Sequence, residues 1–229
     1  MSQNLLKRLI TSIILLSLLI FIIFSHQNIF ILSILLLGLL ICLEANKLFS
    51  KLLTDIDSKK TFPTNKLNIK FIMLNIITFC YTFFIFCNLS YEIYRLESPI
   101  FFLYLISICF CTDIGGYVFG KIIGGKKLSK ISPNKTISGT IGSFLFSIIP
   151  LIVVLNFNYI DLVFNLTNII FCSLISLISQ LGDLFISFIK RKAKIKDTGN
   201  LLPGHGGILD RVDGIIFAVP FSYFLLRLL

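Results

Sequence analysis

Most of the side chains capable of chemistry in this sequence lie in one polar stretch, residues 179–213, between two apolar segments. Five basic residues between 190 and 196 stand there among four aspartates, and a Pro-Gly-His-Gly-Gly turn occupies residues 203–207. Carboxylates are the usual protein ligands of Mg²⁺, and Lys and Arg bind phosphate groups. Together with residues 113–142, the stretch predicts a site for a nucleoside triphosphate, a divalent metal and an anionic lipid.

Two aspartates lie in apolar surroundings. Asp113 ends one apolar run, and Asp183 lies within another. A carboxylate at membrane depth is costly and commonly marks a functional site. Polar residues recur around Asp183 at steps of three and four, the spacing of one helical face. They are Ser176, Ser179, Asp183, Ser187 and Lys190. Such a stripe can also join helices through hydrogen bonds, but its continuation into the basic residues favours a site.

A second polar stretch, residues 130–139, has the composition of a helix N-terminus. Ser132, Thr136 and Gly139 precede an apolar helix there. Free backbone N–H groups and the helix dipole bind phosphate at such a terminus, and Lys135 adds positive charge. The spacing is not that of a P-loop. The sequence therefore predicts phosphate binding by this helix terminus without that motif.

The glycine-rich turn before the last apolar segment is a further candidate. Glycine permits left-handed backbone and the close approach of a ligand, so Gly206 and Gly207 are expected to bind substrate, with His205 beside them. Asp210 and Asp213, three residues apart, would share one helical face if the last helix begins early. With the aspartate of the preceding apolar segment they would supply oxygen ligands to Mg²⁺.

Composition places these residues in a membrane. Of the 229 residues, 56% are hydrophobic and 14% charged, whereas soluble domains carry about 25% charge. Apolar runs of about 17–20 residues can span a bilayer, so we expect an all-α, polytopic integral membrane helical bundle with about seven transmembrane helices, in a range of about six to eight. The predicted spans are residues 9–24, 29–43, 69–89, 100–120, 140–155, 162–189 and 214–229, with an amphipathic connector at 44–70 and a loop at 90–99.

The basic residues predict the orientation. With a cytoplasmic N-terminus, all of the 21 Lys and Arg residues except Arg95 and Arg227 fall on the cytoplasmic side, as the positive-inside rule requires. Both motif-rich loops then face the cytoplasm. The net charge of +10 therefore reflects topology, and we expect no nucleic-acid partner.

Two further expectations concern packing and organisation. Gly116, Gly120 and Gly124 are four residues apart, a spacing that predicts a helix-packing seam. The six cysteines lie in apolar segments without zinc-ligand spacing and are read as packing residues. We divide one membrane domain into N-terminal helices with a basic cytoplasmic connector (1–98) and a catalytic core (99–229).

The spacing of these polar residues resembles the signature of a known family, the phosphatidate cytidylyltransferases or CDP-diacylglycerol synthases. The resemblance rests on three runs: Ser187-x-x-Lys190-Arg191-x-x-x-x-Lys196-Asp197-x-x-x-x-x-Pro203-x-His205-Gly206-Gly207-x-x-Asp210-Arg211-x-Asp213, Asp113-x-x-x-Tyr117-x-x-Gly120, and Ile131-Ser132-Pro133-x-Lys135-Thr136-x-x-Gly139.

The resemblance implies transfer of CMP from CTP to phosphatidate, giving CDP-diacylglycerol and pyrophosphate in phospholipid biosynthesis. It further implies Mg²⁺ with a monovalent cation such as K⁺, a homodimer, and a bacterial inner-membrane location with the site facing the cytoplasm.

Residue roles follow from the same resemblance. The metal ligands would be Asp183 and Asp210 first, then Asp113 and Asp213. The catalytic set would be Lys135, Lys190, Arg191, Lys196, Asp197, His205 and Arg211. The substrate-binding set would be Ser132, Thr136, Gly139, Ser187, Gly206 and Gly207.

The sequence departs from the family pattern at two places. Ile137 and Ser138 stand where the family often has an aromatic residue and Glu, and Lys121 stands in place of Arg, which loses bidentate geometry. The chain is also shorter than typical members. Three alternatives stay open: a CTP-dependent polyprenol or phytol kinase that releases CDP, a transporter of an anionic substrate, and a basic membrane scaffold.

Overall fold

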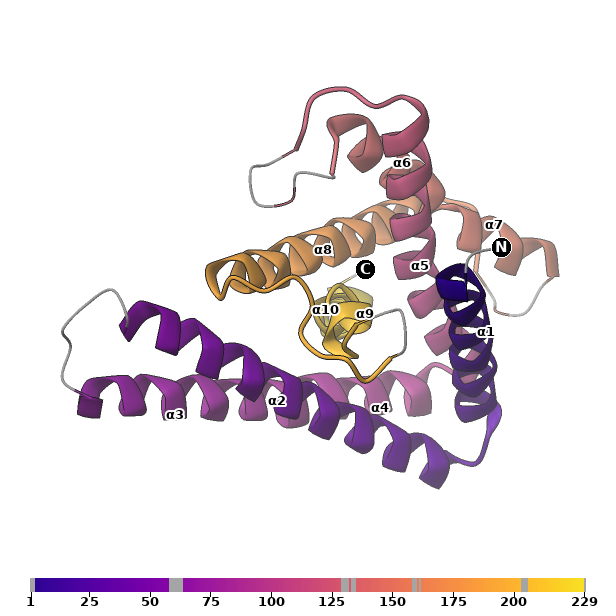
Figure 1. The fold of residues 1–229 in the computed structure, drawn as a ribbon. Helices are drawn as coiled ribbons and strands as arrows, with labels where there is room; N and C mark the ends of the chain where they lie inside the picture. Colours follow the sequence, from indigo (N-terminus) through magenta and orange to yellow (C-terminus); the bar gives the residue numbers. More distant parts are fainter. Residues whose placement is uncertain are drawn as a thin grey trace. The chain divides into compact units, whose positions relative to one another are not determined.

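The computed structural model describes residues 3–57, 64–128, 132, 135–157, 160, 162–202 and 206–228 (Figure 1). Over these residues the regular structure is helical and no strand forms, which confirms the all-α prediction. The helices in chain order are α1 (Gln3–Phe24), α2 (Gln27–Asp57), α3 (Thr64–Cys80), the π-helix η1 (Tyr81–Cys87), α4 (Asn88–Leu96), α5 (Pro99–Ile122), α6 (Ile137–Phe146), α7 (Ile149–Phe157), α8 (Leu166–Lys192), α9 (Leu209–Val212) and α10 (Ile215–Leu228).

Each predicted span coincides with a helix. Among the described residues, five helical segments are long and apolar enough to cross a membrane: Gln27–Leu53, Ile69–Leu96, Pro99–Ile122, Ile137–Phe157 and Leu166–Lys192. The described apolar part of α1, Ile10–Phe24, is shorter, and α10 has 14 residues. Large apolar side chains are exposed along these helices, as a lipid-facing surface requires. The chain is an integral membrane protein, and the number of spans and the side of the N-terminus stay predictions.

The predicted amphipathic connector at 44–70 is helical over its described residues, because α2 continues to Asp57 and α3 begins at Thr64. The second span was therefore predicted to end too early, at residue 43. Apolar residues of α2 keep helical spacing past Glu44, and the buried members are Ala45, Leu48, Phe49 and Leu53. Burial of this face extends the helix, and the exposed residues beside it include Asn46, Lys47, Ser50 and Lys51.

Two other predicted boundaries also shift. Helix α4 runs through most of the predicted loop at 90–99, and an ion pair between Arg95 and Glu92 (3.0 Å) spans one of its turns. Helix α8 begins at Leu166 and not at residue 162. The side chain of Asn165 accepts a hydrogen bond from the backbone N–H of Asn168 (2.8 Å), which caps the helix there.

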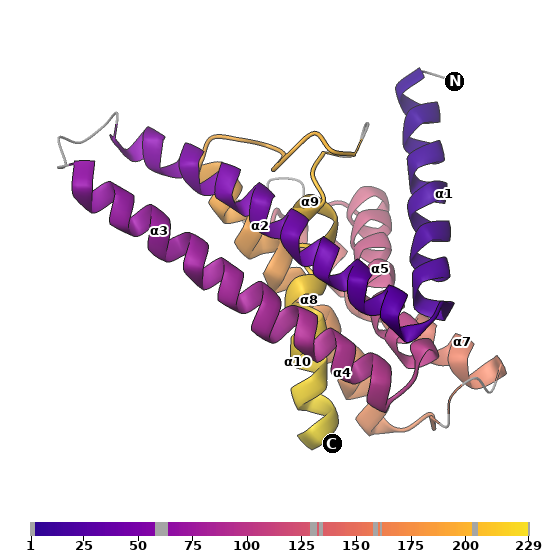
Figure 2. The same ribbon diagram turned by 90° about the horizontal axis from the view of Figure 1, so that it is seen from below.

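The chain forms two compact units. Unit 1 consists of Met1–Tyr91 and Ile189–Val212. Within it, α2 packs along α3 and η1, and the short helix α9 packs on α2 (Figure 2). Gly38 permits the close approach of α2 and η1, since a Cβ there would lie 2.8 Å from the Cys87 Sγ.

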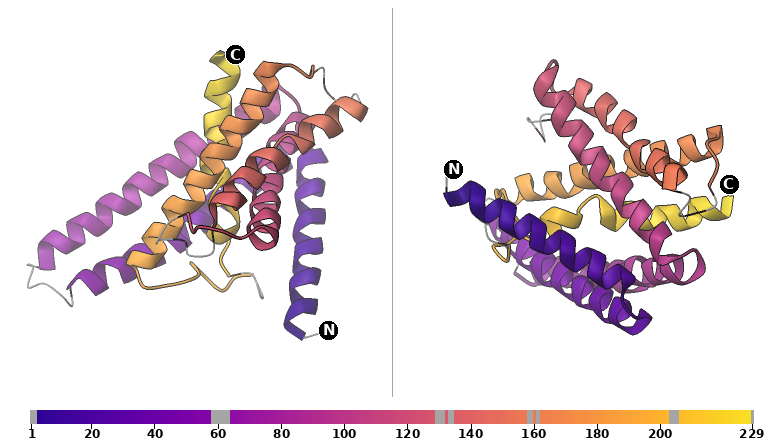
Figure 3. Two further views of the ribbon diagram at one scale, coloured as in Figure 1. Left: turned by 90° about the horizontal axis from the view of Figure 1, so that it is seen from above. Right: turned by 90° about the vertical axis from the view of Figure 1, so that its right-hand side faces the viewer.

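Unit 2 consists of Glu92–Phe188 and Asp213–Leu229. Its most extensive contact joins α5 and α6, which lie side by side (Figure 3). A Cβ on Gly116 would lie 2.7 Å from the Ser143 Oγ, and one on Gly139 would lie 2.8 Å from the Gly116 carbonyl oxygen. Helices α5 and α8 are joined by a hydrogen bond of 3.1 Å between Tyr104 Oη and Cys172 Sγ.

The predicted packing seam is confirmed for two of its three glycines. Gly116 packs against α6, and Gly120 packs against Thr136, the N-cap residue of α6. Gly124 does not, since a Cβ there would meet nothing within 4 Å, and its φ of +63° places it in the turn after α5. Gly115 and Gly142 complete the seam. They were not predicted, because neither belongs to the four-residue series of Gly116, Gly120 and Gly124.

We expect Gly142→Val to lower the free energy of unfolding by about 1–3 kcal/mol, the usual cost of overpacking. Its Cβ would overlap Phe119 and lie 2.8 Å from the Gly115 carbonyl oxygen. Denaturation of the detergent-solubilised protein would measure the change. Ile141→Val, at an exposed position of the same helix, is the control. Equal stability of the two variants would contradict the seam.

Candidate active site

Three of the predicted carboxylates lie close along the chain to one packing point of unit 2, where α5, α8 and the turn at residues 213–214 meet. The side chain of Ser179 on α8 hydrogen-bonds Cys109 on α5. Gly214 packs on the same turn of α8, since a Cβ there would lie 2.9 Å from the Ser179 carbonyl oxygen.

Each of the three carboxylates lies one to four residues along the chain from a residue of this packing point. Asp113 comes four residues after Cys109, and Asp183 comes four residues after Ser179, which is about one helical turn in each case. Asp213 immediately precedes Gly214. Three acidic groups predicted from separate motifs are therefore brought to one region of unit 2.

Lys135 and Asp183 form an ion pair in this region. Ser187 Oγ also donates to Asp183 Oδ1 (3.2 Å). The Lys135 and Asp183 side chains remain 30% and 24% exposed. A pair this exposed contributes little to stability. The exposure also leaves the two groups accessible to a charged ligand.

The predicted helix N-terminus is confirmed beside this pair. Helix α6 begins at Ile137, and Thr136 caps it by accepting a hydrogen bond from the backbone N–H of Gly139 (3.1 Å). Ser138 Oγ donates to the Gly124 carbonyl oxygen. Ser132 lies in the preceding turn, where its carbonyl accepts from the Lys135 N–H (3.1 Å). Lys135 is thus placed at the positive end of a helix dipole.

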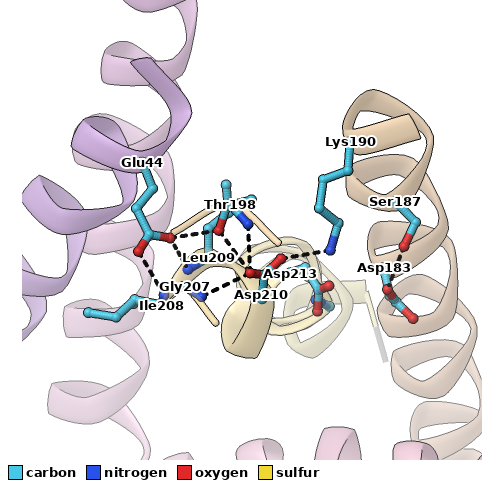
Figure 4. A network of polar contacts seen from close by, with 11 residues as sticks. Glu44, Asp183, Ser187, Lys190, Thr198, Gly207, Ile208, Leu209, Asp210 and Asp213 are labelled. Carbon is cyan, nitrogen blue, oxygen red and sulfur yellow. Dashed lines mark hydrogen bonds and ion pairs between the residues drawn. The ribbon is translucent and has the colours of Figure 1, made fainter. Parts of the chain in front are cut away.

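A second polar cluster belongs to unit 1 and centres on Asp210 of α9 (Figure 4). Its Oδ1 accepts from Lys190 Nζ (2.8 Å). Its Oδ2 accepts from the backbone N–H groups of Thr198 (2.8 Å) and Gly207 (2.9 Å) and lies 3.1 Å from Thr198 Oγ1. The Lys190 and Asp210 side chains are 10% and 5% exposed.

The Asp210 carboxyl is ionised in this setting. Burial alone raises its pKa, but the hydrogen bonds from Lys190, Gly207 and Thr198, with the Lys190 charge, outweigh burial and hold the pKa below its ordinary value. Charge-assisted hydrogen bonds of this kind favour the anion.

Glu44 of α2 is a site residue that the sequence analysis missed. Its side chain is 1% exposed. It accepts hydrogen bonds from the backbone N–H groups of Ile208 (3.0 Å) and Leu209 (2.9 Å) and from Thr198 Oγ1 (2.8 Å) (Figure 4). An acidic residue directly after a long apolar run was the available signal, but the predicted end of the span at residue 43 placed Glu44 in the connector.

The remaining predicted residues of unit 1 flank this cluster. Arg191, Lys196, Asp197 and Arg211 are exposed. Gly206 has a φ of +86° and pairs with Leu202 through two backbone hydrogen bonds of 3.0 and 3.2 Å. His205, with Pro203 and Gly204, lies outside the described residues.

The predicted shared face of Asp210 and Asp213 depended on an early start of the last helix. That condition is not met, because α9 ends at Val212 and α10 begins at Ile215. Asp210 also belongs to unit 1 and Asp213 to unit 2. Among the residues that the structure describes, no three His, Cys, Asp or Glu side chains are close enough to hold a metal ion together.

Comparison with known proteins identifies the family of the chain. The sequence model of the cytidylyltransferase family matches residues 47–229. The chain belongs to the cytidylyltransferase family.

Similar members of the family are named phosphatidate cytidylyltransferase. That of Staphylococcus haemolyticus is 43% identical over 134 residues, which are 58% of this chain and 51% of the relative. That of Bacillus subtilis is 36% identical over 178 residues, 74% and 62% of the two chains. One from Staphylococcus aureus is 46% identical over 134 residues, 58% and 51% of the two chains. This cytidylyltransferase-family chain thus spans about half to three-fifths of the length of these curated relatives.

We expect Lys190→Met to lower the free energy of unfolding by about 3 kcal/mol, the lower end of the usual cost of breaking a buried ion pair. The lower end applies because the donors from Thr198 and Gly207 stay in place around Asp210. Denaturation in detergent would measure it, with the exposed Lys196→Met as control. Lys190→Met combined with Asp210→Asn should recover part of the loss, since no unpaired buried charge remains. A double variant less stable than Lys190→Met would contradict this account.

Proposed function

We propose that the chain carries a phosphatidate cytidylyltransferase activity, in which CMP passes from CTP to phosphatidate to give CDP-diacylglycerol and pyrophosphate. The observation that carries the proposal is the pairing of Lys135 with Asp183 at the N-terminus of α6. Membership of the cytidylyltransferase family and the names of the similar proteins agree with it.

The proposal gives the residues of unit 2 the task of binding polyphosphate. The positive end of the α6 dipole and the Lys135 ammonium favour negative charge. In the structure, Asp183 neutralises Lys135. An entering phosphate would replace this carboxylate as the partner of Lys135 and leave Asp183 for a cation.

The carboxylates of unit 2 fit such a cation by their chemistry. Mg²⁺ prefers oxygen ligands and is commonly bound by one or two carboxylates with substrate phosphates. Asp183 would hold it together with substrate phosphates, Asp113 and Asp213 are further candidate ligands, and a monovalent cation such as K⁺ belongs to the same proposal. When bound, Mg²⁺ neutralises phosphate charge and orients the reacting oxygens. Asp210 of unit 1, which the resemblance ranks with Asp183, is proposed as a metal ligand in its own right, and in the structure both of its oxygens accept hydrogen bonds.

The reaction needs no general base on the protein. A phosphate monoester has a second pKa of about 6 and is largely dianionic at neutral pH, so the lipid phosphate is already a nucleophile. The obstacle is repulsion between two polyanions. Four of the basic residues between Ser187 and Asp213 reduce this repulsion: Lys190, Arg191, Lys196 and Arg211. Their task is to bind phosphates and hold the attacking and leaving oxygens in line.

The remaining parts of the proposal concern the substrates, the oligomeric state and the location of the protein. CTP and phosphatidate are the substrates, the protein is a homodimer in a bacterial inner membrane, and its site faces the cytoplasm. The basic loops on one side of the predicted topology support this orientation.

Product analysis tests the proposal. Protein in detergent would receive phosphatidate, Mg²⁺ and CTP labelled at the α-phosphate. Label in the lipid, with one pyrophosphate released per lipid, is the expected result. Label in CDP, formed with a polyprenol or phytol acceptor in place of phosphatidate, would assign a kinase. Substrate movement across vesicles without pyrophosphate would assign a transporter.

We expect Asp183→Asn to reduce kcat at least a hundredfold while the protein still folds, because a neutral amide binds Mg²⁺ far more weakly than a carboxylate does. Initial rates and denaturation midpoints would be measured together. Glu97→Gln makes the same chemical change outside the candidate site and serves as the control. A wild-type rate in well-folded Asp183→Asn would remove the metal role from this residue.

A further inference from the structure

We propose that Glu44 is a positioning residue that holds the described residues 198–202 and 206–209, called the glycine-rich segment below, against helix α2. The inference about the segment stands on geometry alone, and its consequence for turnover rests on the proposed function. Neither the resemblance nor the comparisons assign a role to this residue.

Glu44 accepts hydrogen bonds from residues at both ends of the segment. Oε1 accepts from the Ile208 N–H at 3.0 Å, and Oε2 accepts from the Leu209 N–H at 2.9 Å, at the start of α9. Oε2 also accepts from Thr198 Oγ1 at 2.8 Å. One side chain of α2 therefore joins the beginning and the end of a segment more than 150 residues away in sequence.

The backbone of the segment is shaped around this carboxylate. A Cβ on Gly199 would lie 2.7 Å from Glu44 Oε1, and a Cβ on Gly207 would overlap Glu44 Oε2. The glycines therefore leave room for the Glu44 side chain as well as for any ligand. This fit gives Gly207 a structural reason beyond the predicted contact with substrate.

The same segment connects Glu44 to Asp210 and Lys190. Thr198 and Gly207 donate their N–H groups to Asp210, which pairs with Lys190. The Thr198 hydroxyl lies 2.8 Å from Glu44 Oε2 and 3.1 Å from Asp210 Oδ2. Because a hydroxyl has one hydrogen, it bridges the two carboxylates and donates to one at a time. Glu44 thus acts on Asp210 and Lys190 through the segment.

The contacts require a carboxylate at position 44. A buried charge in an apolar helix is costly unless hydrogen bonds satisfy it, and the three donors supply that need. Gln keeps the shape but has one acceptor oxygen, and its NH₂ group would face backbone N–H donors. We therefore expect Glu44→Gln to release one end of the segment without changing the core of α2.

Hydrogen exchange of the full chain in detergent tests this directly. In Glu44→Gln we expect the amides of Ile208 and Leu209 to exchange at least tenfold faster than in the wild type, while amides of α5 and α6 are unchanged. Glu97→Gln is the matched control and should leave all of these rates unchanged. Unchanged exchange at Ile208 and Leu209 in Glu44→Gln would overturn the proposal.

A second variant perturbs the contact from the other side. Gly199→Ala presses a methyl group against Glu44 Oε1 while α2 keeps its sequence, so it decides the question if Glu44→Gln does not fold. The same faster exchange at Ile208 and Leu209 is expected. Unchanged exchange in this variant would likewise contradict the proposal.

Turnover then separates this proposal from the proposed function. If the wild type is active, Glu44→Gln should lower kcat at least tenfold, and Glu44→Asp, which keeps the charge, should restore part of it. Full activity of Glu44→Gln despite faster exchange would show that the held segment is not needed for turnover. An inactive wild type would count against the proposed function, while the exchange data would still decide whether Glu44 holds the segment.

Discussion

A carboxylate in an apolar helical protein must find donors or a cation, because water is not available to solvate it. This constraint organises both polar clusters. In unit 2, Asp183 is met by Lys135 and Ser187. In unit 1, Asp210 is met by Lys190 and backbone N–H groups, and Glu44 by backbone N–H groups and a hydroxyl. Each acidic group therefore fixes the position of the segment that supplies its donors.

The two clusters meet this constraint differently, which bears on function. The Lys135–Asp183 ion pair is partly exposed, so a ligand can replace either partner at small cost. The Asp210 and Glu44 carboxylates are almost fully buried and each accepts several hydrogen bonds. The first arrangement suits a binding site, whereas the second suits a fixed support for a glycine-rich segment.

Close backbone approach is the second requirement of the site. Gly116, Gly139 and Gly142 bring α5 and α6 together beside the helix terminus that carries Lys135. Gly182 and Gly214 do the same for α8 and the turn that carries Asp213. In each case a side chain would separate the elements, and the charged residue at their ends would move with them. Packing by glycines in this membrane protein is therefore part of how the charged groups are positioned.

The sequence by itself determined what depends on neighbours along the chain. Apolar runs located the helices, the cap at Thr136 followed from the polar residues before an apolar segment, and the stripe through Asp183 followed from helical period. The sequence could not show that α2 continues past Glu44, since burial of Ala45 and Leu48 decides this. Only the tertiary structure brought Glu44 to Thr198, 154 residues later, and ended α9 at Val212, so that Asp210 lies in α9 and Asp213 in the turn before α10. The physical reason is that hydrogen bonds and packing contacts between distant segments depend on the folded positions of both partners, which no local pattern records.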